Sequence, residues 1–225
     1  SRTYLQALLR YNRCLAQRNA LIKHAGSNNL GLESQLEVWD EQLAILGNAI
    51  FQERSRFIGE LEPVFLRYYQ YISDSRESVS IQYDSHHHKG DIREQLIKNR
   101  NRDLALGYTT KGVHRDDLEL MLGDNPVRRV GSQGQKKSFV MALKLAQYEF
   151  IAGHCGAAPL LLLDDMFDKL DDLRAGKLIE LMGNNIFKQV FITDTQRTRL
   201  VEIVEKAGKD YCFFNVSEGS IISDL

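Results

Sequence analysis

The segment between residues 131 and 171 constrains the fold of this 225-residue chain more than any other. It opens with Gly131-Ser132-Gln133-Gly134-Gln135, and a run of residues with helical spacing follows directly. The glycines allow a tight turn, so several unpaired backbone N–H groups and the positive end of the helix dipole meet at one point. We therefore expect this turn to bind an anion such as a phosphate group.

An apolar run with two acidic residues after it forms the second half of this segment. Leu160 to Leu163 has the character of a strand buried on both faces, and Asp164 and Asp165 follow at its carboxyl end. Open α/β sheets bind ligands at the carboxyl ends of their strands. Carboxylates at that edge can hold Mg²⁺ and orient a water molecule.

Each half also has a simpler explanation, because Ser132 could only cap a helix and the two acids could only end a strand. Their order is more informative. A Ser-x-Gly-Gln turn, one helix, four apolar residues and two acids follow one another in ATPases of the ABC type, so we call Gly131–Gln135 the signature turn. In that class the next loop ends in Leu-Asp, and here Asp171 is expected to cap a helix over 172–182.

The apolar run 189–193 predicts a neighbouring parallel strand that ends at the same sheet edge. Many ABC ATPases place a histidine there for the γ-phosphate, whereas this chain has Asp194, so we expect no such contact. The sequence also contains no Gly-rich loop ending in Gly-Lys-Ser/Thr. We expect that loop in an upstream segment, and we expect this chain alone to be inactive as an ATPase.

Composition narrows the class of protein. Apolar residues make up 43% of the chain, which is enough for one sizeable core and an appendage. Three scattered cysteines argue against disulfide bonds and a zinc site. No run is long and apolar enough for a membrane span and no signal peptide is visible, so we expect a cytoplasmic protein. With a formal net charge of −1, any DNA-binding surface must be local.

The amino-terminal stretch is basic, and no acidic residue precedes Glu33. Its apolar spacing predicts an amphipathic helix in which Arg18 occupies one position of the apolar seam. A second helical stretch, which we expect Pro63 to bend or interrupt before it resumes as far as Tyr71, can pair with the first as an antiparallel hairpin. We expect DNA contacts from Arg10, Arg13, Arg18 and Lys23; the alternative is a solvated basic face.

The middle of the chain is mixed. Residues 78–83 alternate like a strand, residues 91–104 have helical spacing and residues 109–122 suggest a hairpin or an extended run. The sequence therefore predicts a helical, coiled-coil-like arm over residues 1–107 and the carboxyl-terminal part of an α/β ATPase head of the ABC type over residues 108–225. We interpret His86-His87-His88 as a polar loop, and His114-Arg115-Asp116-Asp117 as either a contact to DNA or the head, or a salt-bridged turn.

The order of several segments resembles the bacterial RecF family of recombination proteins, and this similarity covers essentially the whole chain. The matching segments are Arg18-Asn19, Gly112–Leu118, Gly131–Lys136, Ala142–Gln147, Leu162–Asp165 and Leu170–Asp172. Val113 departs from the proline that commonly precedes the histidine in that family. Asp165 stands where most ABC ATPases carry a catalytic glutamate, and RecF proteins resemble this chain there. Aspartate is shorter than glutamate and reaches less far, which fits slow ATP hydrolysis that serves as a switch.

The resemblance implies an ATP-dependent DNA-binding protein of recombinational repair and replication restart. RecF-like proteins bind ATP and Mg²⁺, form ATP-dependent homodimers, engage duplex DNA near single-strand gaps and help mediator proteins such as RecR to load the recombinase. On this chain, Asp164 would hold Mg²⁺ through water, Asp165 would be the catalytic residue that orients the attacking water, and Asp171 would lie near the dimer seam. The nucleotide of the opposite subunit would be contacted by Ser132, Gly134 and Gln135.

Two other classes share part of this pattern. Chromosome-organising ATPases of the SMC or Rad50 type have the same signature order, but their coiled coils are far longer than the arm available here. A nonenzymatic interaction scaffold could also keep the head and lose turnover. The residues upstream of Ser1 discriminate between the classes, because a strand followed by Gly-Lys-Ser/Thr would indicate an ATPase.

Overall fold

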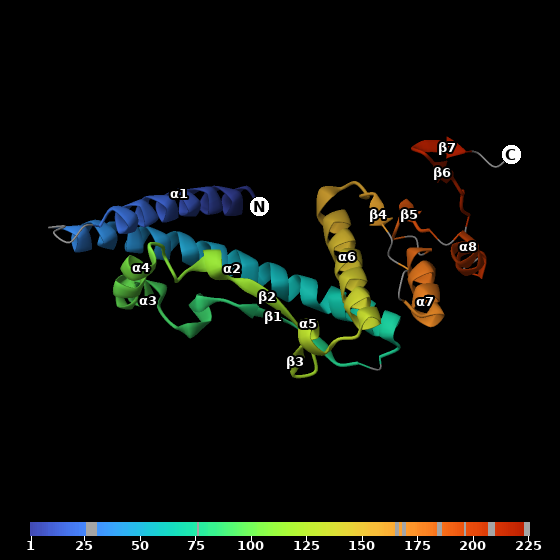
Figure 1. Ribbon diagram of the computed structural model, residues 1–225, viewed down its shortest axis with the longest axis horizontal. Helices are drawn as coiled ribbons and strands as arrows, with labels where there is room; N and C mark the ends of the chain where they lie inside the picture. The colour runs from blue at the N-terminus through green and yellow to red at the C-terminus, as the bar shows by residue number, and fades with distance from the viewer. Residues whose placement is uncertain are drawn as a thin grey trace. The chain divides into compact units, whose positions relative to one another are not determined.

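The computed structural model describes residues 1–25, 31–75, 77–164, 167, 170–183, 186–195, 197–206 and 210–222. The chain divides into two compact units. Unit 1 comprises residues 1–63 and 79–126, and unit 2 comprises residues 64–78 and 127–225. Both units mix helices and strands, and helix predominates (Figure 1). The division into an arm and a head after residue 107 stays a prediction.

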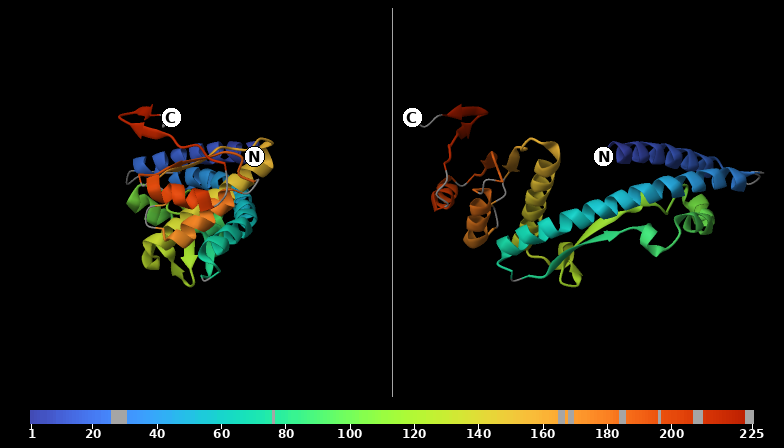
Figure 2. Two further views of the ribbon diagram at one scale, coloured as in Figure 1. Left: turned by 90° about the vertical axis from the view of Figure 1, so that its right-hand side faces the viewer. Right: turned by 180° about the vertical axis from the view of Figure 1, so that it is seen from behind.

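Two long helices dominate unit 1, α1 (Arg2–His24) and the first part of α2 (Leu32–Ser73). They lie side by side in all views (Figures 1 and 2). Their direction is antiparallel, because Tyr4 near the start of α1 contacts Arg54, whereas Arg18 near its end contacts Asp40. The apolar seam predicted for the hairpin is therefore present, with Tyr11 and Ile22 buried.

Helix α2 continues without interruption from unit 1 into unit 2, with Pro63 inside it. We expected Pro63 to bend or interrupt this helix, and an interruption does not occur. A proline removes one backbone hydrogen bond. Leu61 and Phe65 are buried on either side of it, and packing of a buried face stabilises a helix in a protein more than any single backbone bond does.

The rest of unit 1 is a small antiparallel sheet with short helices. Strand β1 (Val79–Asp84) pairs along its whole length with β2 (Asp117–Leu122), so Ile81 lies opposite Leu120. The strand predicted over 78–83 is thus confirmed within one residue. The helical stretch predicted over 91–104 is divided in two at Asn99. The remaining elements are η1 (His86–Lys89), α3 (Ile92–Lys98), α4 (Arg100–Leu106), η2 (Val113–Arg115) and β3 (Asn125–Pro126).

The core of unit 1 joins these elements around the two long helices. Its buried members come from α1, α2, α3 and η2, and they are Tyr11, Leu43, Leu46, Ile50, Leu96 and Val113. On α2 they recur at steps of three and four residues, which places them on one face of the helix. The chain from α3 to η2 is thereby held against the hairpin.

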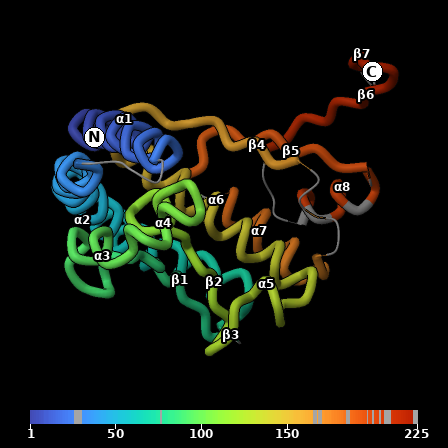
Figure 3. The backbone as a smooth tube through the Cα atoms, turned by 60° about the vertical axis from the view of Figure 1, so that its left-hand side comes forward, coloured from blue at the N-terminus to red at the C-terminus, as the bar shows by residue number. Residues whose placement is uncertain are grey.

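Unit 2 contains the segment between residues 131 and 171, from which the ABC-type head was predicted (Figure 3). Strands β4 and β5 are parallel, with Asp164 opposite Thr193, as the two apolar runs predicted. The helix expected over 172–182 has those bounds, and Asp171 is its N-cap. In chain order the elements are α5 (Val127–Val130), α6 (Gln133–Cys155), β4 (Leu161–Asp164), α7 (Asp172–Met182), β5 (Val190–Thr193), α8 (Arg197–Lys206), β6 (Asn215–Ser217) and β7 (Ser220–Ile222).

Strand β4 corrects one expectation, because it is buried on one face and not on both. Leu161 and Leu163 are buried, whereas Leu162 is 63% exposed. Phe191 on β5 is also exposed. Among the described residues the sheet has only these two strands, and a parallel sheet needs a packed layer on each face before all its side chains are buried.

The core of unit 2 packs aromatic rings from the end of α2 against α6. The ring of Phe139 lies 4.5 Å from that of Tyr69 and 5.7 Å from that of Phe65, measured between centroids. Such tilted pairs stabilise beyond the area they bury. No helix in the described part of the chain is sufficiently long and apolar to cross a membrane.

Candidate functional site

The signature turn is shaped by a close approach of two backbone segments. The amide of Gly131 donates to the carbonyl of Val127, at 2.9 Å, which closes α5. A side chain at position 131 would place its Cβ only 2.6 Å from that carbonyl oxygen. Glycine is therefore required where the chain turns into α6.

Ser132 caps α6 through a reciprocal pair of hydrogen bonds. The amide of Gln135 donates to the Ser132 hydroxyl at 3.2 Å, and the amide of Ser132 donates to Oε1 of Gln135 at 2.8 Å. This capping box satisfies two backbone groups at the helix start. The simpler explanation of Ser132 as a helix cap is thus realised in the structure, and it leaves the binding role untested.

The start of α6 nevertheless fits an anion. Within the described part of the chain, the backbone N–H groups of Gln133 and Gly134 make no hydrogen bond. Ser132 and Gln133 are exposed. Two free donors at the positive end of a 23-residue helix are the groups that bind phosphate oxygens.

Asp164 lies at the carboxyl end of β4, opposite Thr193 on β5. The Thr193 hydroxyl donates to its carboxylate, and the Asp164 side chain is open to solvent. An accessible carboxylate oxygen of this kind is a suitable partner for a hydrated Mg²⁺ ion. Asp165, the predicted catalytic residue, lies outside the described residues.

Asp171 caps α7, and its carboxylate accepts from the amide of Arg174 at 2.8 Å. The Arg174 guanidinium also approaches it, with Nε 3.3 Å from Oδ2. The same guanidinium donates to the hydroxyl of Ser138 and to the carboxylate of Glu77, each at 2.9 Å. Sequence reasoning missed Glu77 and Arg174, because neither residue belongs to a recognisable motif.

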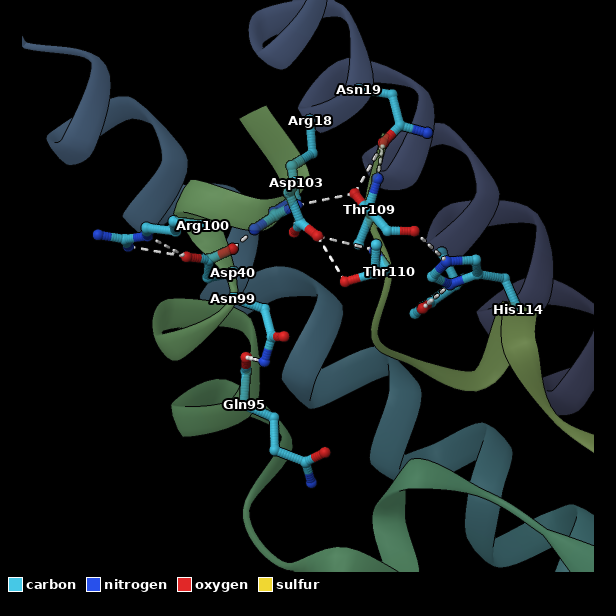
Figure 4. Close-up of polar contacts among 11 residues, drawn as sticks. Arg18, Asn19, Asp40, Gln95, Asn99, Arg100, Asp103, Thr109, Thr110 and His114 are labelled. Carbon is cyan, nitrogen blue, oxygen red and sulfur yellow. Dashed lines mark hydrogen bonds and ion pairs between the residues drawn. The ribbon is translucent and has the colours of Figure 1, made fainter. Parts of the chain in front are cut away.

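Three of the four residues predicted to bind DNA lie on the exposed surface of α1, namely Arg10, Arg13 and Lys23. Arg18 does not, because its side chain is fully buried. Its Nε donates to Asp40 and its Nη1 to Asp103, both at 2.7 Å (Figure 4). Arg18 therefore has no surface with which to contact DNA, and its prediction as a DNA-binding residue is wrong.

A buried network surrounds Arg18 in unit 1. Arg100 donates twice to the second oxygen of Asp40, at 2.9 and 2.7 Å, so two arginines balance two aspartates. Asp103 in turn accepts from the backbone and hydroxyl of Thr110 (Figure 4). These bonds join α1, α2, α4 and the following loop. Their character is structural, because Arg18, Asp40 and Asp103 have no exposed surface for a ligand.

His114 belongs to the same unit and extends this network. Its Nε2 lies 3.0 Å from the carbonyl of Thr109, which can only accept, so Nε2 carries the proton. Its Nδ1 therefore accepts from the Tyr11 hydroxyl at 2.8 Å. Burial lowers the pKa of His114 and raises the pKa of Tyr11, and both changes favour these neutral forms. The neighbouring Asp116 pairs with Arg54 at 2.7 Å. A salt-bridged turn is therefore present.

Known proteins resemble the chain along almost its whole length. DNA replication and repair protein RecF of Bacteroides fragilis is 45% identical over 219 residues, which are 97% of this chain and 58% of that protein. RecF of Flavobacterium johnsoniae is 42% identical over 95% of the chain. The chain is a RecF homologue. It spans about 58% of the length of the RecF proteins of Bacteroides fragilis and Bacteroides thetaiotaomicron. None of the family models compared with the sequence matches it.

Solved structures of RecF proteins are also similar to this chain. The recombination mediator protein RecF-ATPrS in the RecFOR pathway superposes with a TM-score of 0.73 and 29% identity, over 98% of this chain and 58% of that one. RecF-ATP of the same pathway gives a TM-score of 0.71 over 87% of the chain. The chain thus has a RecF-like fold, mixed in helix and sheet and mostly helical.

Proposed function

We propose that this chain is part of an ATP-dependent DNA-binding protein of recombinational DNA repair and replication restart. The 45% identity to a RecF protein over 97% of the chain is the observation that carries this proposal. The chain then supplies the carboxyl-terminal part of an ABC-type ATPase head together with a helical arm. The exposed sheet face at Leu162 and Phe191 would be covered by the rest of that head.

The signature turn would reach the nucleotide held by the opposite subunit of an ATP-dependent homodimer. The unpaired N–H groups of Gln133 and Gly134 and the exposed Ser132 support this role, because they can meet phosphate oxygens from solvent. Gln135 would shape the turn through its bond to the Ser132 amide. A γ-phosphate bridging two subunits would make their association depend on ATP.

The acidic edge of the sheet would serve hydrolysis. Mg²⁺, when bound, would supply neutralising charge at the phosphates. Asp164 would hold it through water, and its orientation is supported by the hydrogen bond from Thr193. Asp165 would orient the attacking water. Turnover would be slow in the complete protein, and this chain alone would not hydrolyse ATP.

DNA binding would involve the exposed cations of α1. Arg10, Arg13 and Lys23 carry no ion pair within the described part of the chain, so they can neutralise phosphates of a duplex near a single-strand gap. The DNA-bound dimer would then act with recombination mediators such as RecR to load the recombinase. This proposal places the protein in the cytoplasm.

Ser132→Arg in the full-length protein tests the proposal. A long cation would occupy the place of a small hydroxyl and block close approach of two heads around ATP. We expect ATP binding to persist, ATP-driven dimerisation in sedimentation to weaken by more than about tenfold, and ATP-stimulated DNA binding to be lost. Val140→Arg, on an exposed position of the same helix, is the matched control. Wild-type dimerisation of Ser132→Arg would show that Ser132 is only a helix cap.

A further inference from the structure

Glu77 and Arg174 lie at the centre of a continuous chain of polar contacts in unit 2. Glu77 belongs to the short segment after α2, and Arg174 to the first turn of α7. The guanidinium of Arg174 contacts three groups at once, because it donates to Glu77 and Ser138 at 2.9 Å and lies 3.3 Å from Asp171. Ser138 also donates to the carbonyl of Gly134, at 3.0 Å. Arg174 therefore links the start of α7 to the first turn of α6.

Glu77 completes the chain on its other side. Burial alone would raise the pKa of Glu77, but hydrogen bonds from Tyr69, Gln135 and Arg174 and the charge of Arg174 together lower it. The Gln135 side chain that meets Glu77 also accepts from the amide of Ser132. Contacts thus run without a break from Ser132 in the signature turn to Asp171 before α7.

This arrangement is suited to holding two short segments in a fixed relation. The side chains of Arg174 and Glu77 are only 17% and 14% exposed, so solvent screens their attraction less than it screens a surface pair. A guanidinium presents its donors in one rigid plane, which fixes the directions of its three partners. Lysine could preserve the charge at position 174 but not this geometry.

We propose that Glu77 and Arg174 are positioning residues for the ATP-driven association of two subunits. They would act through the groups they hold: Gln135 and Ser138 in the first turns of α6, and Asp171 at the start of α7. The inference rests on the proposed function, since it assumes that the signature turn and Asp171 meet the opposite subunit. It adds that these two segments bind the partner as one preformed surface.

The test compares variants of the full-length protein by ATP binding, thermal unfolding and ATP-dependent sedimentation. Arg174→Met removes all three contacts, and we expect it to bind ATP within about twofold of wild type while its dimerisation weakens about tenfold, as loss of a charge-assisted hydrogen bond predicts. Arg174→Lys should restore part of the loss. Lys177→Met is the matched control, because Lys177 lies one turn further along α7 and pairs with Asp74 at 2.6 Å, and it should dimerise like wild type.

The outcomes separate this inference from the proposed function. Ser132→Arg is measured beside the other variants: if it dimerises like wild type, the role of the signature turn fails. If Ser132→Arg is defective and Arg174→Met dimerises normally, only the positioning role is overturned. Should Arg174→Met not fold, Glu77→Gln decides, because it keeps the shape of the side chain and removes its charge. Glu77→Gln is expected to lower dimerisation at unchanged ATP affinity, and wild-type dimerisation by it overturns the proposal.

Discussion

Unit 1 and unit 2 each hold an arginine between carboxylates, but only the network in unit 2 reaches residues that are exposed to solvent. Arg18 and its partners Asp40 and Asp103 have no exposed side-chain surface. Arg174 lies in a network that leads to Ser132 and Asp171, both of which are exposed. Ion pairs of similar chemistry can therefore stabilise a fold or position an exposed surface, depending on whether the network reaches solvent-exposed residues.

The physical cost of the two networks also differs. Burial of a charge is strongly unfavourable unless partners replace its hydration. In unit 1 two arginines and two aspartates provide that replacement for one another, although Nη2 of Arg18 finds no partner among the described residues. In unit 2 the groups keep part of their hydration. Loss of one ion-pair partner should therefore destabilise unit 1 more than loss of one partner destabilises unit 2.

The largest expected effect comes from breaking the closed network. Asp103→Ala should lower the free energy of unfolding by about 3–5 kcal/mol, because it leaves Arg18 charged and buried with one carboxylate fewer. Urea denaturation followed by the fluorescence of Trp39, the only tryptophan of this chain, measures it. Asp84→Ala, which breaks an exposed pair with Lys89, should cost less than about 1 kcal/mol. Equal losses in the two variants would contradict the comparison.

The next effect concerns Asp164, at the carboxyl end of β4 in unit 2, and the residue that follows it in the sequence, Asp165. Asp164→Asn should weaken Mg²⁺-dependent use of ATP by the full-length protein, whereas Asp165→Asn should retain ATP binding and slow hydrolysis by about a hundredfold or more. A prolonged DNA-bound state should accompany the slower hydrolysis. Both variants should unfold like wild type, in contrast to Asp103→Ala. If both variants hydrolyse ATP at the normal rate, Asp164 and Asp165 do not have the proposed roles in hydrolysis.

The smallest effect is expected on the surface of α1 in unit 1, where Arg10 and Arg13 form no ion pair with any residue that the structure describes. Replacing Arg10 and Arg13 together by glutamine should weaken duplex binding modestly and reduce the slope of log affinity against log salt by about two. Fluorescence anisotropy over a salt series measures both. Lys89→Gln, an exposed cation paired with Asp84, is the control. An unchanged salt slope would place the DNA contact elsewhere.

The sequence predicted those features whose groups lie close together in the chain. Asp171 was expected to cap a helix over 172–182, and both the cap and the bounds are confirmed. The parallel pairing of β4 with β5 followed from two apolar runs separated by one helix. In each case the local pattern contained the information, because a cap acts within one turn and a crossover connection has few alternatives.

Distant partners explain the features that the sequence did not predict. Arg18 was assigned to DNA because it lies in a basic stretch, but its partners Asp40 and Asp103 are 22 and 85 positions away. One signal was present, since Arg18 occupies a position of the apolar seam. Glu77 and Arg174 are 97 positions apart and gave no such signal. Charge alone does not say whether a side chain will meet solvent or a carboxylate.

The path of the chain has a consequence for dissecting the protein. The chain passes between the units three times, after residues 63, 78 and 126, and the first passage lies inside the continuous helix α2. Neither unit is therefore one stretch of sequence, and a protease that cut once between α2 and β1 would leave both pieces contributing to unit 1. We expect the two pieces to co-migrate under native conditions and to separate only after denaturation.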